Sequence, residues 1–131
     1  MEDNNKKYNI EKVLKHFIYA GLWASYDDDD EFLDASYDIE DVDINSQREL
    51  KLRIKNFILK NTSILERHNI TEEMLGHDLF FSSRGHGVGF WDRGYGSDGE
   101  DLHNSSEDHF DSDPPDVDAS GKIYFMEGLK Q

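Results

Sequence analysis

Residues 76–96 read GHDLFFSSRGHGVGFWDRGYG, and this stretch decides the fold that we expect. It holds six of the ten glycines and two of the six histidines of the chain. Apolar residues at 79–81 and again at 88–91 stand on either side of a short link that contains Gly85 and Gly87. Two β-prone runs joined by such a link are typical of a β-hairpin. The sequence therefore predicts a hairpin here.

Two helices are expected before this stretch. Residues 9–25 and 46–67 both carry apolar residues at spacings of three and four, which places them on one face of a helix. Asn9 can cap the first helix, and Asp43, Asn45 or Ser46 can cap the second. Both segments should pack through these faces.

The rest of the chain predicts smaller elements. Residues 71–75 suit a single helical turn stopped by Gly76, residues 100–110 a short weak helix, and GKIYFMEGL at 121–129 a β-prone run. We therefore expect one α+β domain over residues 1–131. Its two N-terminal helices would pack on a small antiparallel sheet, made of the hairpin and the C-terminal strand, with a short extra helix.

Charge is the strongest global property of the chain. It has 29 Asp and Glu against 14 Lys and Arg, for a net charge of -15. Like charge argues against direct binding to nucleic acid or anionic membranes and favours a basic partner. Cysteine is absent, which excludes disulfides and thiolate chemistry. With no long apolar segment and no signal-peptide core, a cytoplasmic protein is expected, and no motif calls for a cofactor.

The carboxylates gather in two segments. Residues 27–43 contain ten and residues 98–118 contain nine, and neither segment contains Lys or Arg. Such surfaces can imitate the phosphates of DNA and occupy a basic groove of another protein, or they can simply confer solubility. For the first role, the candidate contact residues are Asp27, Asp28, Asp29, Asp30, Glu31, Asp98, Glu100 and Asp101, with Trp91 and Tyr95 as aromatic anchors.

A dense set of ionisable residues within 76–94 indicates an alternative, a small enzyme or a metal-dependent protein. Histidine and carboxylate side chains support acid–base chemistry, and they also brace tight turns through hydrogen bonds to the backbone. The candidate residues are His77, Asp78, Arg84, His86, Asp92 and Arg93. A site of two histidines and one carboxylate could be drawn from His77, His86, His103, Asp78 and Asp92.

One further pattern fits a calcium loop. Asp116, Asp118, Ser120 and Glu127, with Gly121 at the turn, match the spacing of an EF-hand loop. Pro114 and Pro115 occupy the place of the incoming helix, which favours a plain turn into the last strand.

The segment GHDLFFSSRGHGVGFWDRG at 76–94 resembles a motif, approximately GHDFWLTRNGHGAGFWDRG, of a family of small acidic proteins from bacteriophages and other mobile elements. The resemblance extends to AGLWASYDDDDEFLDASYDIEDV at 20–42 and to GKIYF, but departs at 79–81 and in the extra acidic residues of 111–118. The residues shared with the motif are Gly76, His77, Asp78, Gly85, His86, Gly87, Gly89, Phe90, Trp91, Asp92, Arg93 and Gly94, with Arg84 displaced by one position.

What the resemblance implies is a phage or mobile-element origin, and it carries over no catalytic residues. Small acidic phage proteins are often stoichiometric inhibitors, so we expect a non-enzymatic protein that blocks a host defence or nucleic-acid-processing complex at its basic surface. Imitation of DNA is one way to do so. The sequence is also compatible with a homodimer.

Overall fold

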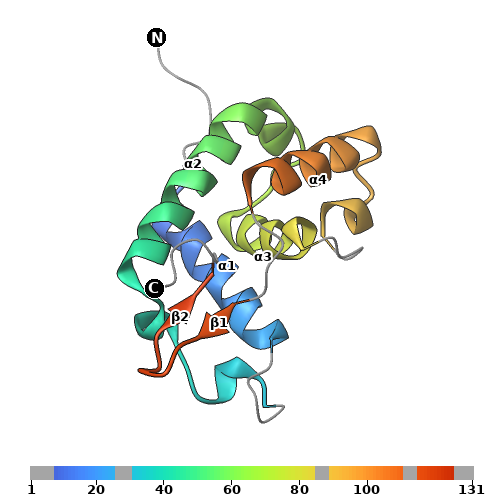
Figure 1. Ribbon diagram of the computed structural model, residues 1–131. Coiled ribbons are helices and arrows are strands. Elements are labelled where there is room, and N and C mark those ends of the chain that lie inside the picture. Colours follow the sequence, from blue (N-terminus) through green and yellow to red (C-terminus); the bar gives the residue numbers. More distant parts are fainter. Residues whose placement is uncertain (1–7, 26–30, 85–88, 111–114, 126–131) are drawn as a thin grey trace.

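The computed structural model describes residues 8–25, 31–84, 89–110 and 115–125. Within these residues helices dominate, and the strands form one small sheet (Figure 1). The α-helices are α1 (Ile10–Ala24), α2 (Ile44–Arg67), α3 (Glu72–Ser83) and α4 (Ser97–His109). The short elements are the 3-10 helices η1 (Leu33–Ala35), η2 (Ile39–Asp41) and η3 (Phe90–Arg93), and the strands β1 (Asp116–Val117) and β2 (Ile123–Tyr124).

The predicted α+β fold, with two helices on a hairpin sheet, is wrong. Residues 79–81 belong to α3 and residues 90–93 to η3, so neither apolar run of the expected hairpin is a strand. A short apolar run has the same composition in a buried strand and in a buried helix, and periodicity cannot separate the two. Here the run is helical, and Leu79, Phe80 and Phe81 are all buried.

Gly76 continues α3 instead of ending it. A Cβ atom at this position would lie 2.5 Å from the Val13 carbonyl oxygen and 2.8 Å from both the His16 Cβ and the Phe17 backbone nitrogen. The missing side chain therefore lets α3 lie directly against α1. Glycine here is needed for close packing of two helices, not for a turn.

The core is built around Phe17 on the buried face of α1. Its ring centroid lies 5.6 Å from that of Phe80 on α3, 5.2 Å from Phe110 after α4, and 5.9 Å from Phe125 after β2. One aromatic side chain thus joins segments from across the sequence. Val13, Leu14, Ile18 and Leu22 complete the buried face, as the apolar spacing predicted.

Both predicted N-terminal helices are confirmed, including their caps. The Asn9 side chain accepts a hydrogen bond from the Lys12 N–H, and the Asp43 side chain accepts from Asn45 and Ser46. Helix α2 is kinked at Asn61, whose side-chain amide donates to the Phe57 carbonyl and to the Ser105 hydroxyl of α4. This contact fixes α4 against the C-terminal half of α2.

The predicted C-terminal strand is present but short. Strands β1 and β2 pair antiparallel, with Val117 opposite Ile123, and Ile123 also forms a parallel bridge with Val42. The Asp43 N–H donates to the Ile123 carbonyl over 2.8 Å. The sheet is therefore attached to the start of α2 (Figure 1). Within 31–43, Leu33 and Val42 are buried, so this part of the acidic segment is ordered.

None of the helices in the described residues has the length and apolarity needed to cross a membrane.

Candidate functional site

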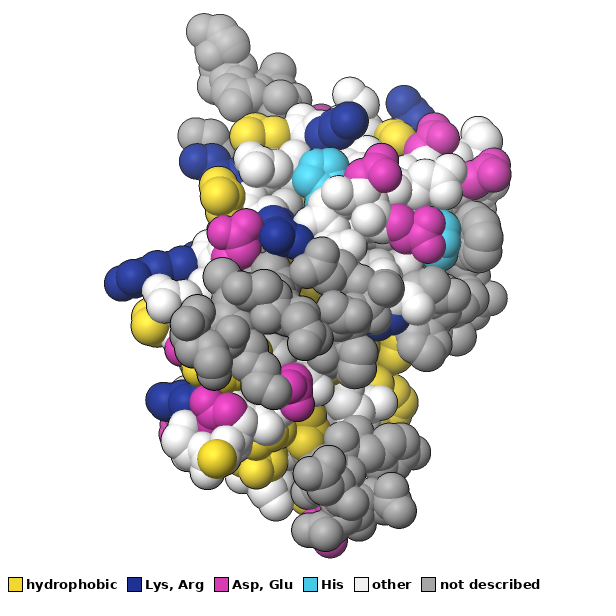
Figure 2. Space-filling model, in the orientation of Figure 1, with side chains coloured by type: hydrophobic (Ala, Val, Ile, Leu, Met, Phe, Trp, Pro, Cys, Tyr) yellow, Lys and Arg dark blue, Asp and Glu magenta, His cyan; other side chains and the backbone are white. Residues whose placement is uncertain are grey.

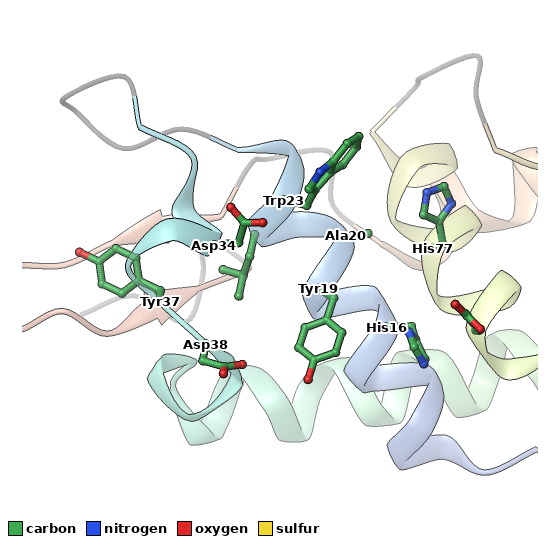
Figure 3. Close-up of a pocket in the computed structure, with 10 residues that line it drawn as sticks. His16, Tyr19, Ala20, Trp23, Asp34, Tyr37, Asp38 and His77 are labelled. Carbon is green, nitrogen blue, oxygen red and sulfur yellow. The ribbon is translucent and has the colours of Figure 1, made fainter.

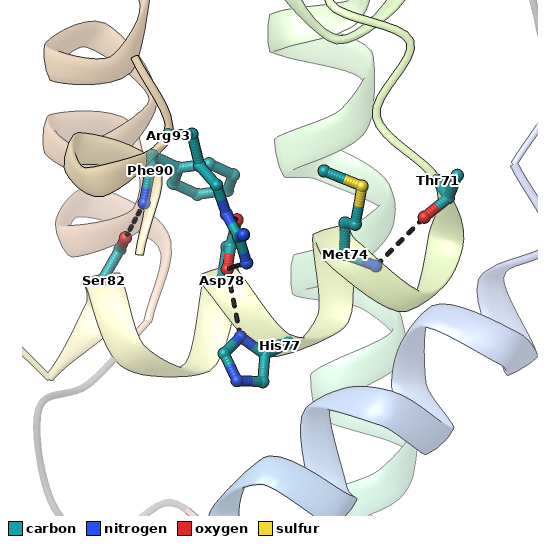
Figure 4. Close-up of polar contacts among 7 residues, drawn as sticks. All are labelled: Thr71, Met74, His77, Asp78, Ser82, Phe90 and Arg93. Atoms are coloured by element: carbon teal, nitrogen blue, oxygen red, sulfur yellow. Dashed lines mark hydrogen bonds and ion pairs between the residues drawn. The ribbon is translucent and has the colours of Figure 1, made fainter. Parts of the chain in front are cut away.

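The polar contacts of the described part of 76–94 centre on Asp78, whose carboxylate is fully buried on α3. Arg93 of η3 donates from Nε to Oδ2 over 2.9 Å and from Nη2 to Oδ1 over 2.8 Å, and the His77 Nδ1 lies 3.0 Å from Oδ1 (Figure 4). A buried charge is costly unless it is paired and hydrogen-bonded. The two-pronged ion pair therefore fastens η3 onto α3.

A second contact fastens the same two elements. The Ser82 hydroxyl accepts a hydrogen bond from the Phe90 N–H over 3.1 Å (Figure 4), and Gly89 has no room for a Cβ beside that hydroxyl. A Cβ on Gly99 would in turn lie 2.9 Å from the Phe90 carbonyl oxygen. Shared motif residues thus serve packing between α3, η3 and α4.

Only part of the predicted His/Asp/Arg cluster is assembled. His77, Asp78 and Arg93 meet, whereas the Arg84 guanidinium lies over the Phe80 ring, 4.5 Å from its centroid. His86 and the side chain of Asp92 lie outside the described part of the structure. His103 is buried on α4, with its Nε2 3.4 Å from a Glu107 carboxylate oxygen.

No metal site is formed in the part of the chain that the structure describes, where no three His, Asp or Glu side chains converge suitably. In the EF-hand-like segment, Asp118 Oδ1 accepts hydrogen bonds from the Ser120 N–H, the Ser120 hydroxyl and the Lys122 N–H. These bonds lower the pKa of the Asp118 carboxyl. Asp116 lies in β1, and Glu127 is outside the described residues.

The predicted acidic contact residues differ in their exposure and in their contacts within the molecule. Asp98 is used internally, because its Oδ2 lies 2.8 Å from His68 Nε2 and 2.7 Å from Arg67 Nη1. Hydrogen bonds from His68 and Arg67 hold the pKa of the Asp98 carboxyl below its ordinary value. Glu31, Glu100 and Asp101 are exposed. Residues 27–30 lie outside the described part of the structure.

The predicted aromatic anchor Tyr95 does not stand free on the surface. Tyr95 is half-buried, and its ring centroid lies 4.4 Å from that of His68. Burial, and then the charge of Asp78, raise the pKa of the Tyr95 hydroxyl. The side chain of Trp91 is outside the described part. Tyr95 therefore serves as a packing contact for the turn before α4.

The structure shows a hollow that the sequence did not predict. It has a volume of about 630 Å³ and crosses the outer face of α1, between the η1–η2 segment on one side and α3 on the other (Figure 3). Its floor comes from α1 residues at helical spacing, and its walls carry carboxylates. The lining residues are His16, Tyr19, Ala20, Leu22, Trp23, Asp34, Tyr37, Asp38, Glu73 and His77.

Two aromatic side chains that line the hollow are exposed to solvent. Trp23 is 61% exposed and Tyr19 is 40% exposed. The signal was present in the sequence, because His16, Tyr19, Ala20 and Trp23 follow the spacing i, i+3, i+4, i+7 and so share one helical face. The sequence could not predict the walls of the hollow, because Asp34 and Glu73 come from segments distant from α1 in the sequence.

Comparison with protein-family models, with curated proteins and with solved structures found no match to this chain.

Proposed function

We propose that this chain is a non-enzymatic binding protein of phage or mobile-element origin. It acts in the cytoplasm of the host cell, where it occupies a basic, nucleic-acid-binding surface of a defence or nucleic-acid-processing complex. The observation that carries the proposal is the outer face of α4. Four exposed carboxylates share this face within about a third of a turn of one another: Glu100, Asp101, Glu107 and Asp108.

The number of these charges per length of helix axis is close to that of a nucleic-acid strand, and they lie in two pairs, at 100–101 and at 107–108. From Glu100 to Asp108 the helix axis rises by about 12 Å, at 1.5 Å per residue. One strand of B-DNA carries a phosphate every 3.4 Å or so of axis. Four carboxylates over this length therefore give a comparable line of negative charge. A basic groove built for phosphates would be attracted to it.

Lysines and arginines of the same molecule do not cover this face in the described residues. Most of them lie on α2, and their ion pairs there go to Glu11, Glu49 and Asp98. Figure 2 shows carboxylates over α4 at the upper right, and Lys and Arg both along the left edge and at the top beside these carboxylates. Within the described residues, Arg67 of α2 neutralises Asp98 at the start of α4, but the ion pairs of α2 do not extend to Glu100, Asp101 or Asp108.

The catalytic alternative draws less support from the same geometry. A side chain that acts as a general acid or base must be able to reach the substrate and exchange a proton with it. The Asp78 carboxylate is buried and already bonded by Arg93 and His77, and Arg84 packs over Phe80. These contacts favour a structural role for the motif.

The test is capture of a partner from host lysate by tagged protein at low and high salt, with identification by mass spectrometry. The α4 variant carries Glu100→Gln, Asp101→Asn and Asp108→Asn, which leaves the Glu107 contact with His103 in place. A matched variant, Asn56→Lys, Ser63→Lys and Ala119→Lys, changes the net charge equally at exposed positions elsewhere.

We expect capture of a stoichiometric partner that has a nucleic-acid-binding surface. High salt and the α4 substitutions should both weaken its binding, whereas the matched variant should still bind it. Equal capture by both variants, or capture that salt does not weaken, would contradict the proposal. Thermal unfolding of both variants checks that each one is folded.

A further inference from the structure

We propose that the hollow across α1 binds the guanidinium of an arginine side chain presented by the partner. In this assignment Trp23 supplies the stacking surface, and Asp34 and Glu73 supply the opposite charge. The inference rests on the proposed function, since a phosphate-binding surface is rich in arginine, and it names a second contact beside α4.

The floor of the hollow offers aromatic surface on a rigid element. Trp23 and Tyr19 project from α1 on either side of Ala20, whose small side chain leaves the space between them (Figure 3). Helix α1 is fixed by the packing of Phe17 and by Gly76 beneath it. Exposed tryptophan on a well-ordered helix is the residue most enriched among binding hot spots.

The charge of the lining selects a cation. Among the described residues, three carboxylates line the hollow, from Asp34, Asp38 and Glu73, and no lysine or arginine does. The Asp38 carboxylate also accepts from the Ile39 N–H over 2.7 Å, within the cap of η2. All three acids are exposed, and Asp34 and Glu73, whose carboxylates are not used in such a cap, are the two best placed to meet a ligand. An apolar ligand would strip water from these acids without compensation, so the lining disfavours one.

The molecule itself shows a cation held on this surface. Lys15 Nζ lies 5.8 Å from the centroid of the Tyr19 ring. Attraction between a cation and an aromatic face is favourable, and it is strongest for tryptophan. With Lys15 over Tyr19, the more exposed Trp23 ring is the surface open to an incoming cation.

Arginine fits this lining better than lysine. Its guanidinium is planar, stacks on aromatic rings and can fork to a carboxylate while stacked, whereas an ammonium is compact and strongly hydrated. The volume of about 630 Å³ lies within the range of sites that hold small molecules, so it accommodates a long side chain with adjacent backbone.

The experiment is NMR titration of the labelled protein with the blocked tripeptide Gly-Arg-Gly, beside Gly-Lys-Gly and Gly-norleucine-Gly. We expect saturable shifts at the Trp23 indole N–H and at the amides of Ala20 and Asp34 with the arginine peptide. Trp23→Ala, and separately Asp34→Asn with Glu73→Gln, should weaken binding about tenfold. Leu59→Ala removes a similarly exposed apolar side chain outside the hollow and should leave binding unchanged.

Equal binding of the norleucine peptide, equal binding of the lysine peptide, or no shifts at the hollow would each overturn the assignment. Much tighter binding of agmatine, a free guanidinium compound, would overturn the docking of a partner side chain.

Lysate capture separates this inference from the function it rests on. If Trp23→Ala retains the partner while the α4 variant loses it, the hollow fails and the α4 proposal stands. If the hollow binds arginine but no nucleic-acid-binding partner is captured, the proposed function fails.

Discussion

The guanidinium of Arg93 holds the buried carboxylate of Asp78 through two hydrogen bonds, of 2.9 and 2.8 Å. The two residues lie fifteen positions apart and belong to η3 and α3. A pair of this geometry combines charge with fixed direction. It is the principal polar contact that holds the 76–94 segment in its observed form.

The first prediction concerns the removal of Arg93. Arg93→Met should lower the free energy of unfolding by roughly 2–3 kcal/mol, because it leaves the Asp78 carboxylate buried without its cation. Breaking a fully buried pair typically costs about 3–5 kcal/mol, and Arg93 is partly exposed, which moderates the loss. Urea denaturation at pH 7 measures the change.

The double variant Asp78→Leu with Arg93→Met is its control. Removing both charges takes away the cost of an unpaired buried carboxylate, so the double variant should be more stable than Arg93→Met alone. A double variant that is less stable than Arg93→Met would show that the ion pair is not what the segment requires.

The second prediction concerns the contact of α3 with α1. Gly76→Ala places a methyl group 2.5 Å from the Val13 carbonyl oxygen, and backbone on both helices must move to admit it. We expect a loss of about 3 kcal/mol, at the upper end of what overpacking costs. Chemical denaturation, followed by circular dichroism, measures it.

Gly21→Ala is the matched comparison on α1. Its methyl group would meet the Phe125 ring, 2.5 Å from Cε2, and a ring can rotate more cheaply than backbone can shift. Gly76→Ala should therefore be the more damaging of the two variants. The reverse order would mean that the two helices are not held as closely as the structure shows.

The predicted helices came out correctly because their signals are local. The apolar spacing of 9–25 and of 46–67 and the caps Asn9 and Asp43 all depend on residues within a few positions of one another. The weak helix expected at 100–110 is also present, as α4, and it starts three residues earlier at Ser97.

The predicted hairpin is wrong because the structure of this segment depends on contacts with residues that are distant in the sequence. Gly76 was predicted to end a helix, but it lies where α3 packs against α1. Asp78 was a candidate catalytic acid, but its carboxylate accepts hydrogen bonds from Arg93. The hollow was missed for the same reason. Its walls, Asp34 and Glu73, meet α1 only in the folded chain.

The third prediction concerns Asp98 and acid. Because the pKa of its carboxyl is held below the ordinary value of 3.8, its stabilising effect is complete above that value and is lost as the pH falls below it. Asp98→Asn should be less stable than the natural chain at pH 7, and the difference should shrink as the pH falls below 3.8. Asp108→Asn removes an exposed carboxylate of the same helix and should change the stability at pH 7 less than Asp98→Asn does. A difference between Asp98→Asn and the natural chain that does not shrink in acid would contradict the assignment.

The fourth prediction concerns Tyr8, whose hydroxyl donates to the Ile70 carbonyl over 2.6 Å and so ties the start of α1 to the turn before α3. Burial, and then the charges of Glu72 and Glu66, raise the pKa of Tyr8 to about 12. Because the neutral phenol is the favoured form, its contribution is complete below pH 10 and is lost as the pH rises through about 12. Tyr8→Phe should cost about 1 kcal/mol at pH 7, through the lost hydrogen bond.

Ultraviolet titration of phenolate tests this assignment directly. Tyr8 should ionise near pH 12 in the native protein, so the absorbance change at that pH should be smaller in Tyr8→Phe by the contribution of one tyrosine. In urea the late step should disappear from the natural chain as well, because an unfolded tyrosine titrates near pH 10. A late step of unchanged size in Tyr8→Phe would belong to another tyrosine. The bond to Ile70 would then not hold the phenol as the structure shows, since a closely held neutral phenol resists ionisation.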